Sequence, residues 1–360
     1  MFENEKKVYD LLQDEESKQI FLNKLLFNIT SDCKYVDRMV KECIKLSDIE
    51  RNLGKEIYRK DIDRLYKLIN KRRVIIYGAG SNGLCYAILF SRIMKDADVA
   101  AFCDQKAEKQ NYKFYGFDVI DFKTLIEKYQ DCIVIITPQN YKTEIYNALI
   151  ENNFNADNIY KDLPFDLDTV LGQYFDDKII KFGQNEIFAD AGCFDCGTDI
   201  EFIKRCPDYK KIIAFEPDIN NIETCRKAIK KRKIRDIEIK QCGLWDKKDI
   251  LRFNAGNEML SNINEKGDIA INVDAMDSII KDDKITFLKM DIEGSELKAL
   301  HGARKIIQRD KPKLAICVYH KPEDIIEIPL YINSLVPEYK LYMRHYGYTP
   351  ANTVLYAIIQ

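Results

Sequence analysis

Residues 188–199, with the sequence FADAGCFDCGTD, decide the fold of the carboxy-terminal half of the chain. Small and apolar residues at 186–191 are typical of a buried strand, and the glycines at positions 192 and 197 allow a tight turn. A helical pattern follows from Thr198. This order of strand, turn and helix predicts one unit of a parallel α/β sheet.

The first acid at a strand end after this turn is Glu216, which Pro217 follows. Together with the glycine turn, it fits a site for S-adenosylmethionine. Amides at the helix N-terminus would contact the methionine end of that cofactor, and the carboxylate would accept hydrogen bonds from both ribose hydroxyls. The alternative is a structural turn with Glu216 facing solvent.

The same turn holds a C-x-x-C pair, Cys193 and Cys196. The sequence has no second C-x-x-C and no histidine at zinc-finger spacing, so the ligands for a closed tetrahedral metal site fall short. We therefore expect both cysteines to line the turn as small residues.

Further α/β units follow the turn. Apolar and β-branched runs predict strands at 211–216, 237–242, 286–291, 314–319, 340–345 and 353–359, and helices at 198–205, 219–231, 295–309 and 323–335. The connection at 346–352 is too short for a crossover helix, so the last strand should enter the sheet antiparallel. Seven strands with an antiparallel terminal strand follow the order of the class I methyltransferase sheet.

A third group of candidate residues lies at 287–296, FLKMDIEGSE. The two-residue period of a strand places Lys289 and Asp291 on one face. In a parallel sheet covered on both faces, such charges need a partner or a ligand. Glu293 and Glu296 have an alternative interpretation, as acids that stabilise the start of a helix through its dipole.

Two of the three histidines, His320 and His345, lie near the ends of expected strands. A histidine at the carboxyl edge of an α/β sheet can act as a general base near neutral pH, and a hydrogen-bonded structural imidazole is the alternative. His301 falls in the middle of an expected helix, and we expect it at the surface.

The amino-terminal half contains a separate glycine motif. Gly78, Gly80 and Gly83 form a G-x-G-x-x-G after the strand-like run VIIY, and Asp104 ends the next such run, VAAFCD. This motif fits a nucleotide, with the glycines near a pyrophosphate and the acid on ribose hydroxyls, whereas a scaffold without a ligand is the alternative. Hydride chemistry is disfavoured, because no substrate domain of the dehydrogenase type follows.

We expect three parts in this α/β chain. Residues 1–70 form a helical segment, 71–163 a smaller Rossmann-like domain, and 164–360 the class I methyltransferase-like sheet.

The composition limits the partners of the protein. Lys and Arg number 56 and Asp and Glu 58 in 360 residues, so the net charge of -2 provides no broad positive field for nucleic acid. No window is apolar enough for a membrane span, and the start MFENEKKVYD lacks the order of a signal peptide, which predicts a cytoplasmic protein. The 11 cysteines are too scattered for a disulfide framework, and we expect reduced thiols.

The motifs of the carboxy-terminal half, in their joint order, resemble the FkbM family of S-adenosylmethionine-dependent methyltransferases. They are FADAGCFDCGTD, AFEPD, CGLWD, AMDSII, FLKMDIEGSELKALHGA, VYHKPEDIIEIPLYI and MRHYGYTPANTVLYAI, within residues 174–359. Cys196 departs from the pattern, since the family often has glycine there. Residues 73–160 separately resemble the Rossmann-like domains appended to bacterial glycan-modifying enzymes.

The resemblance implies a role for each matching residue. The cofactor-binding set would be Asp190, Gly192, Cys193, Asp195, Gly197 and Thr198 in the turn, Glu216 and Pro217 at the ribose, and Asp246 on the adenine side. Lys289, Asp291 and Glu293 would form the wall beside the methyl donor. The family also implies O-methylation of a sugar, glycan or related natural-product hydroxyl.

Methyl transfer to a hydroxyl is an in-line displacement, which needs an aligned donor and acceptor and a group that removes a proton. We predict that His320 is this base, and that His345, Asp291 and Lys289 orient the acceptor or balance its charge. A divalent ion held by Asp291 and Glu293 is a variant of this mechanism.

Two other classes of function stay open at this point. The chain could be a nucleotide-sensing regulatory protein with an inactive methyltransferase fold, or an NAD-dependent oxidoreductase that uses residues 78–104. The sequence leaves the oligomeric state open, a homo-oligomer included.

Overall fold

The computed structural model describes residues 2–32, 34–36, 38–39, 67–69, 71–92, 98–108, 113–162, 173–253, 269–347 and 349–359. The chain forms two compact units. Unit 1 comprises residues 1–21, 172–344 and 351–360, and unit 2 comprises residues 22–171 and 345–350.

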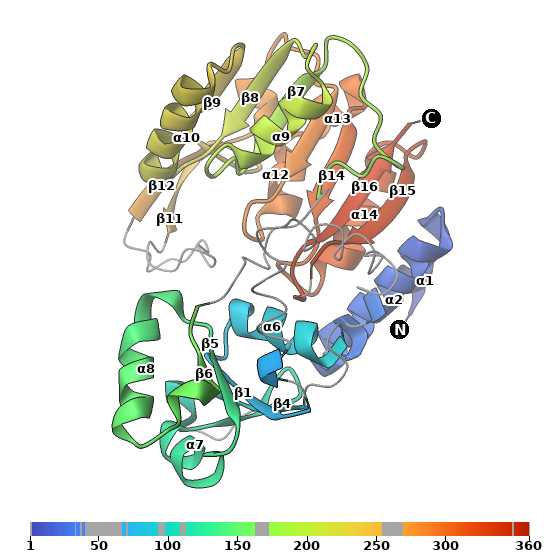
Figure 1. Cartoon of the computed structure of the whole chain (residues 1–360). Helices are drawn as coiled ribbons and strands as arrows, with labels where there is room; N and C mark the ends of the chain where they lie inside the picture. Colours follow the sequence, from blue (N-terminus) through green and yellow to red (C-terminus); the bar gives the residue numbers. More distant parts are fainter. Residues whose placement is uncertain are drawn as a thin grey trace. The chain divides into compact units, whose positions relative to one another are not determined.

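Unit 1 contains a seven-stranded sheet in the order β15-β16-β14-β13-β7-β8-β9 (Figure 1). Its strands are β7 (Ile187–Ala191), β8 (Lys211–Phe215), β9 (Ile237–Lys240), β13 (Phe287–Met290), β14 (Lys313–Cys317), β15 (Lys340–His345) and β16 (Thr353–Ile358). Strands β9, β8, β7, β13 and β14 pair in parallel, and β16 is antiparallel to β14. This topology confirms the predicted class I methyltransferase sheet.

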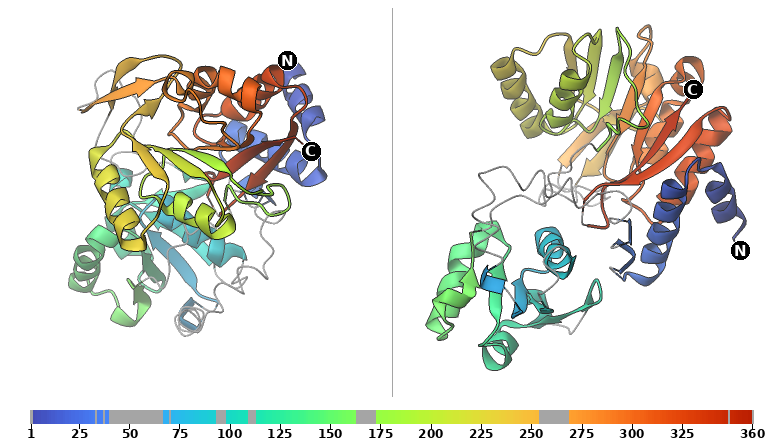
Figure 2. Two further views of the ribbon diagram at one scale, coloured as in Figure 1. Left: turned by 90° about the horizontal axis from the view of Figure 1, so that it is seen from above. Right: turned by 45° about the vertical axis from the view of Figure 1, so that its right-hand side comes forward.

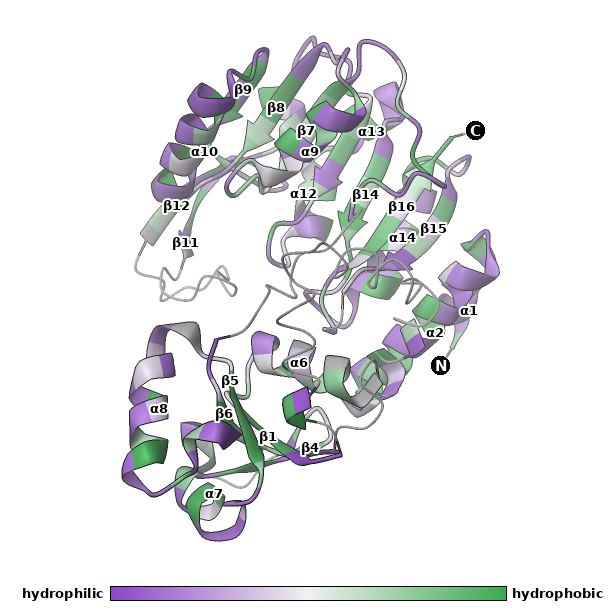
Figure 3. Ribbon diagram, in the orientation of Figure 1, coloured by the Kyte–Doolittle hydropathy of each residue, from purple (hydrophilic) through white to green (hydrophobic). Residues whose placement is uncertain are grey.

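The helices of unit 1 connect neighbouring strands of the seven-stranded sheet. Helices α9 (Gly197–Arg205) and α10 (Ile219–Arg232) connect β7, β8 and β9 in one direction along the sheet, whereas α12 (Glu296–Gly302) and α13 (Arg304–Asp310) connect β13 and β14 in the other. Because such crossovers are right-handed, the two pairs cover opposite faces. The strands are mainly hydrophobic and the outer side of α10 is hydrophilic (Figure 3).

A single helix was expected at 295–309, and the structure divides it at Ala303. A Cβ atom on Gly302 would lie 1.9 Å from the carbonyl oxygen of Trp245, so the chain packs closely there. The carboxylate of Asp277 accepts hydrogen bonds from the backbone N–H groups of Lys305 and Ile306, both at 2.9 Å. This side chain satisfies free donors at the start of α13, which stabilises a new helix.

A second, three-stranded sheet in unit 1 was not expected. It has the order β10-β12-β11, with β10 (Gly243–Leu244), β11 (Asp249–Phe253) and β12 (Ile269–Asp274). The short helix α11 (Met276–Ile279) follows β12, and α14 (Asp324–Leu335) precedes β15.

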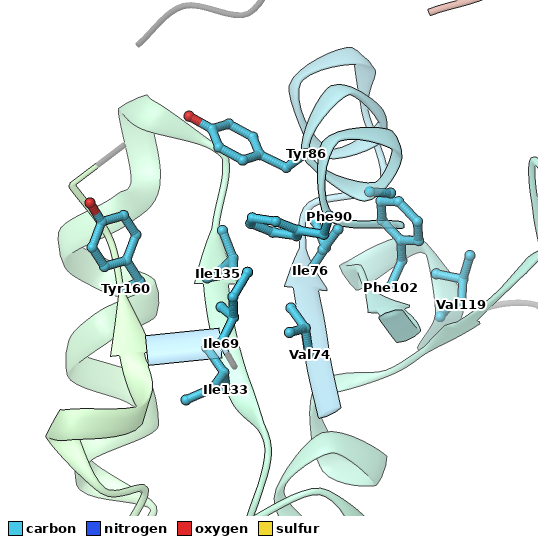
Figure 4. Packing of buried hydrophobic residues seen from close by; sticks show 12 residues of the cluster. Ile69, Val74, Ile76, Tyr86, Phe90, Phe102, Val119, Ile133, Ile135 and Tyr160 are labelled. Carbon is cyan, nitrogen blue, oxygen red and sulfur yellow. The ribbon is translucent and has the colours of Figure 1, made fainter. Parts of the chain in front are cut away.

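Unit 2 contains a six-stranded sheet in the order β3-β4-β2-β1-β5-β6. The strands are β1 (Arg73–Tyr77), β2 (Asp98–Cys103), β3 (Lys113–Phe114), β4 (Phe117–Ile120), β5 (Ile133–Ile136) and β6 (Ile159–Tyr160), with helices α6 (Ser81–Arg92), α7 (Phe122–Lys128) and α8 (Lys142–Glu151). Strands β1, β2 and β5 were expected, and β3, β4 and β6 were not. Ile76, Phe90, Phe102 and Ile135 belong to a buried cluster on one face of this sheet (Figure 4).

Two helices open the chain, α1 (Glu3–Leu11) and α2 (Glu15–Thr30). Helix α1 contacts α14 (Figure 2), and the Arg344 guanidinium donates to Asp14 Oδ2 at 2.6 Å and to Ser17 Oγ at 2.8 Å. The start of the chain is therefore anchored to strand β15. Residues 40–66 of the helical segment expected at 1–70 lie outside the described residues.

Within the described helices, none has both the length and the hydrophobicity needed to cross a bilayer.

Candidate active site

The glycine turn after β7 packs against the end of β13. Gly192 has φ 81°, a conformation that favours glycine, and a Cβ atom there would lie 2.0 Å from the carbonyl oxygen of Asp291. The Gly192 N–H donates to Phe215 O at 3.0 Å. The carboxyl ends of β7, β8 and β13 therefore meet at one edge, where ligands of open α/β sheets bind.

A buried ion pair supports this turn. Lys289 Nζ lies 2.9 Å from Asp190 Oδ1, and both side chains are buried. The same ammonium donates to Ala191 O at 3.2 Å and to Gly192 O at 2.6 Å. Burial raises the pKa of Asp190, and the charge of Lys289 opposes this effect. Lys289 therefore holds the backbone of the turn, and Asp190 is its buried ionic partner.

Glu216 directly follows β8 and contacts the same turn. Its Oε2 accepts a hydrogen bond from Phe194 N at 3.1 Å, and its Oε1 accepts one from Asp218 N at 2.9 Å. Burial raises the pKa of Glu216 to about 7. The side chain of Asn221 is a third hydrogen-bond partner of this carboxylate. Because a carboxylate has about four acceptor positions, a ribose hydroxyl can use the remaining one or replace Asn221.

The other predicted cofactor residues lie around the turn at different depths. Asp195 is exposed, and its Oδ1 accepts from Gly197 N at 2.8 Å at the start of α9. Thr198 and Pro217 are half-buried, whereas Cys193 is buried. Asp246 lies farther along unit 1, where its Oδ2 is 3.2 Å from Lys298 Nζ.

A second group of side chains surrounds Asp291 at the end of β13. The hydroxyl of Tyr174 donates to its Oδ2 at 2.6 Å, and the hydroxyl of Tyr319 donates to its Oδ1 at 3.0 Å. Burial alone would raise the pKa of Asp291, but Lys289, His320 and the two hydroxyls together lower it. Asp291 is therefore held as a carboxylate.

His320 lies among three carboxylates in this group. Its Nδ1 is 3.0 Å from Glu296 Oε1, and its Nε2 is 3.4 Å from Asp291 Oδ1 and 3.6 Å from Glu293 Oε2. Burial alone would lower the pKa of His320, but the three carboxylates raise it to about 9. The ring is thus protonated at neutral pH, which differs from the expectation of an imidazole that titrates near its ordinary value.

Glu293 is the most accessible member of this group, with 39% of its side chain exposed. Burial of the remainder raises its pKa to about 7, in opposition to the positive charge of His320. Its backbone has φ 56°, which is uncommon for a residue with a side chain and occurs where a site constrains the chain.

The carboxylate and imidazole atoms also meet a geometric requirement for metal binding. One ligand atom each from Asp291, Glu296 and His320 lie within 4.8 Å of one another. A cation there would have to displace the proton of His320, because only the neutral ring is a ligand.

Comparison with known proteins bears on this arrangement. A sequence model described as the methyltransferase FkbM domain matches residues 187–350. Residues 187–350 thus match an FkbM methyltransferase domain, and this region is called the FkbM domain below. A second model, described as C2185-like, N-terminal, matches residues 70–160. A search of curated proteins finds no match.

Several solved structures are similar to this chain. Methyltransferase FkbM from Methylobacillus flagellatus KT has 20% identity, covers 81% of this chain and 92% of its own, and has a TM-score of 0.46. An rRNA methylase from Streptococcus thermophilus has 16% identity, with coverages of 49% and 89% and a TM-score of 0.33. Aeropyrum pernix fibrillarin, solved with natively bound S-adenosyl-L-methionine, has 11% identity, coverages of 49% and 67% and a TM-score of 0.30.

Within the FkbM domain, the structure brings together Lys289, Asp291, Glu293 and His320, but it does not bring His345 into this group. His345 is fully buried in β15 and belongs to unit 2. Burial, followed by the charge of Lys24, lowers its pKa to about 3, so the ring stays neutral. His301 is exposed, as expected, and its ring packs 4.1 Å from that of Tyr331.

The nucleotide motif of unit 2 forms its own turn outside the FkbM domain. Gly78 has φ 106°, and the Ala79 N–H donates to Asp104 Oδ2 at 3.0 Å. Gly83 packs closely, since a Cβ atom there would lie 2.1 Å from Gly78 O, whereas one on Gly80 would meet nothing within 4 Å. Ligand binding by Gly78, Gly80, Gly83 and Asp104 stays a prediction.

Sequence analysis missed Tyr174 and Tyr319, the two hydroxyl donors to Asp291 of the FkbM domain. It also assigned Glu296 no role at His320. Tyr319 precedes His320 in the motif VYH, which offered a signal, but Tyr174 lies far from both in the sequence.

Proposed function

We propose that the FkbM domain transfers a methyl group from S-adenosylmethionine to a hydroxyl of a sugar, glycan or related natural-product acceptor. The arrangement of the turn is the main support: Gly192 lets the backbone approach β13, and the Glu216 carboxylate lies beside the turn, where it can accept from a ribose hydroxyl. The helix N-terminus at Gly197 adds N–H groups for an anionic carboxylate.

The carboxylate group next to the turn supports methylation of a hydroxyl. The hydroxyl proton must leave as the oxygen attacks the methyl carbon, and a base whose pKa is close to the working pH suits this task. Glu293 fits this role better than His320, because its pKa is about 7 and its side chain is the more exposed of the two. Protonated His320 would then orient Glu293 and Asp291.

The pH dependence of methyl transfer distinguishes these two bases. With Glu293 as the base and His320 required in its charged form, the rate should rise with a midpoint of about 7 and fall near about 9. The measurement is transfer of labelled methyl groups to a panel of nucleotide sugars and glycans between about pH 5.5 and 10. Glu293→Gln should remove the lower limb and cut turnover about 10²- to 10⁴-fold.

His320→Gln should remove the upper limb in the same assay. If His320 is the base, as the sequence alone suggested, the wild-type rate will instead rise once, near about 9, and Glu293→Gln will keep that limb. Inhibition by a chelator and rescue by a divalent ion would show that a cation at Asp291 replaces both schemes.

Cofactor choice needs a separate measurement. Calorimetric titration of the full chain with S-adenosylhomocysteine, NAD and sugar nucleotides separates the proposed methyltransferase from the oxidoreductase and the nucleotide sensor. We expect S-adenosylhomocysteine to bind. Binding of NAD or a sugar nucleotide alone would contradict the proposal and favour a function of the Gly78 turn.

A further inference from the structure

Three cysteines from two segments of unit 1 meet at the turn that contains Gly192. Cys193 lies in the turn, Cys196 is the residue before α9, and Cys225 lies in α10. All three are buried, their Sγ atoms lie within 4.8 Å of one another, and the Sγ atoms of Cys193 and Cys225 are 3.8 Å apart. The third cysteine, Cys225, supplies a ligand that the C-x-x-C pattern lacks.

A buried acid accompanies these thiols. Asp199, in the first turn of α9, is 0% exposed, and its one side-chain hydrogen-bond partner among the described residues is the thiol of Cys196, a weak donor. Asp199 and Cys196 lie close enough for each to perturb the pKa of the other. A buried acid with only a thiol beside it is costly as a carboxylate, and such groups indicate either a neutral side chain or a missing ligand.

We propose that Cys193, Cys196 and Cys225 bind one Zn²⁺ ion as thiolates, with Asp199 as the fourth ligand. At the usual Zn–S distance of about 2.3 Å, two sulfur atoms of a tetrahedral site are about 3.8 Å apart. The Sγ atoms of Cys193 and Cys225 have this separation. Binding would release the thiol protons to solvent and involves no change of oxidation state.

Two alternatives to metal binding, apolar packing and a disulfide, explain fewer of the observations at these cysteines. Packing as small apolar groups fits their contacts with Ala214, but it requires Asp199 to stay buried as a neutral acid beside a thiol. A disulfide between Cys193 and Cys225 would leave Cys196 and Asp199 unused, and it requires an oxidant to reach buried sulfur. A metal ion would use all four side chains at once.

The surrounding charges are compatible with this site. Three thiolates and one carboxylate exceed the charge of one Zn²⁺ ion. The positive charge of Lys289, which Asp190 shares, acts on both Cys193 and Asp199, so we expect one thiol or Asp190 to keep its proton when the metal binds. The Cys225 thiol lies 3.1 Å from Phe194 O, and Phe194 N in turn donates to Glu216. A metal here would fasten α10 to the turn and would fix the position of Glu216.

The test is metal binding by the purified full chain. We expect about one zinc ion per wild-type chain by elemental analysis, and Co²⁺ should replace it with the thiolate charge-transfer and tetrahedral d–d absorption typical of a sulfur-rich site. Cys225→Ala should bind Co²⁺ at least about tenfold more weakly. Cys206→Ala is the matched control, because Cys206 is another buried cysteine of unit 1 outside this cluster, and it should bind Co²⁺ as the wild type does.

Asp199→Asn serves as the second variant. It should keep the thiolate charge-transfer band while its affinity for Co²⁺ falls. The wild type alone can overturn the proposal, whether or not the variants fold: folded, reduced protein that shows no thiolate band with Co²⁺ excludes the site. An intact mass lower by two hydrogen atoms without reductant would show a disulfide instead. These readouts do not depend on S-adenosylhomocysteine, so a failed methyltransferase assay leaves them interpretable.

Discussion

The two glycine turns of the molecule, at Gly78 in unit 2 and at Gly192 in unit 1, share one backbone scheme. Each glycine has positive φ, and its N–H donates to the last residue of the neighbouring strand, Cys103 O at 2.8 Å and Phe215 O at 3.0 Å. In each, an acid after that strand accepts an N–H of the turn: Asp104 from Ala79, and Glu216 from Phe194.

The difference lies in the strand on the other side of each turn. In unit 2, the Thr137 hydroxyl donates to Tyr77 O at 2.9 Å, and Pro138 follows it. In unit 1, the equivalent donor is the Lys289 ammonium, which requires the buried Asp190 as its partner. The backbone turn is therefore common to both units, and the chemistry depends on what the adjoining strand supplies.

Beyond Lys289, the same strand leads to the ionisable group around Asp291. A threonine followed by proline offers unit 2 no acid or base at this place. The comparison explains why methyl transfer is proposed for unit 1 alone, although both units carry a strand-end acid at the turn.

The largest effect expected from this comparison is on cofactor affinity. Glu216→Ala removes a carboxylate that would accept from two ribose hydroxyls, each worth about 1.5 to 3 kcal/mol as a charge-assisted hydrogen bond. Affinity for S-adenosylhomocysteine should fall about 10²- to 10⁴-fold in calorimetric titration. Asp104→Ala, at the equivalent place in unit 2, should leave this affinity unchanged. Equal losses in both variants would show that the two acids do not have separate ligands.

The next largest effect is on stability, when the side chain that supports each turn is replaced. Lys289→Met leaves Asp190 buried without its ionic partner, which typically destabilises a protein by about 3 to 5 kcal/mol. Thr137→Val removes one neutral hydrogen bond and should cost only about 1 kcal/mol. Urea unfolding, followed by the fluorescence of Trp245, the 1 tryptophan in the sequence and a residue of unit 1, measures the first of these directly.

The sign of the pH dependence tests the cause of this loss. Burial raises the folded-state pKa of Asp190, and loss of Lys289 should raise it further. A raised carboxyl pKa means that the folded state binds more protons than the unfolded state, so stability falls as pH rises from the unfolded value of about 3.9 towards the folded value. The deficit of Lys289→Met should therefore be smaller near about pH 5 than near about pH 8. A deficit independent of pH would point to lost packing instead.

Much of this fold could be predicted because its strands are β-branched runs that end at glycines or acids. The seven strands of the large sheet follow from such local patterns, as does the antiparallel entry of β16. Strands β10 and β12 could not be predicted, because β10 has two residues and forms only through pairing with a distant segment. The break at Ala303 depends on Asp277, which lies outside the helix that it divides.

The candidate site likewise contains residues that local sequence patterns predict and residues that only tertiary packing brings in. Gly192, Glu216 and Asp291 stand at strand ends, so their meeting at one edge follows from the sheet order. Tyr174 and Cys225 reach the site from other segments, and only tertiary packing reveals them. The pKa of His320 is the clearest case, since a histidine alone predicts a titration near neutral pH, whereas the packing of Glu296 and two more carboxylates raises the pKa to about 9.

The smallest expected effect is the loss of stability when single glycines of the two turns are replaced by alanine. A Cβ atom on Gly192 would lie 2.0 Å from the backbone oxygen of Asp291. One on Gly78 would lie 2.7 Å from the Thr137 hydroxyl and 2.8 Å from the Pro138 ring, which are longer distances and involve side chains rather than backbone. Both glycines also have positive φ, which costs other residues about 1 to 3 kcal/mol. Gly192→Ala should lose about 3 kcal/mol and Gly78→Ala somewhat less, whereas Gly80→Ala, with open space around its Cβ, should change stability by less than about 0.5 kcal/mol. Trp245 lies in unit 1, so its fluorescence should detect the loss of stability in Gly192→Ala, and circular dichroism should detect the loss in Gly78→Ala.

If Gly80→Ala destabilises the chain as strongly as Gly192→Ala, the close approach of neighbouring strands is not what requires glycine in these turns.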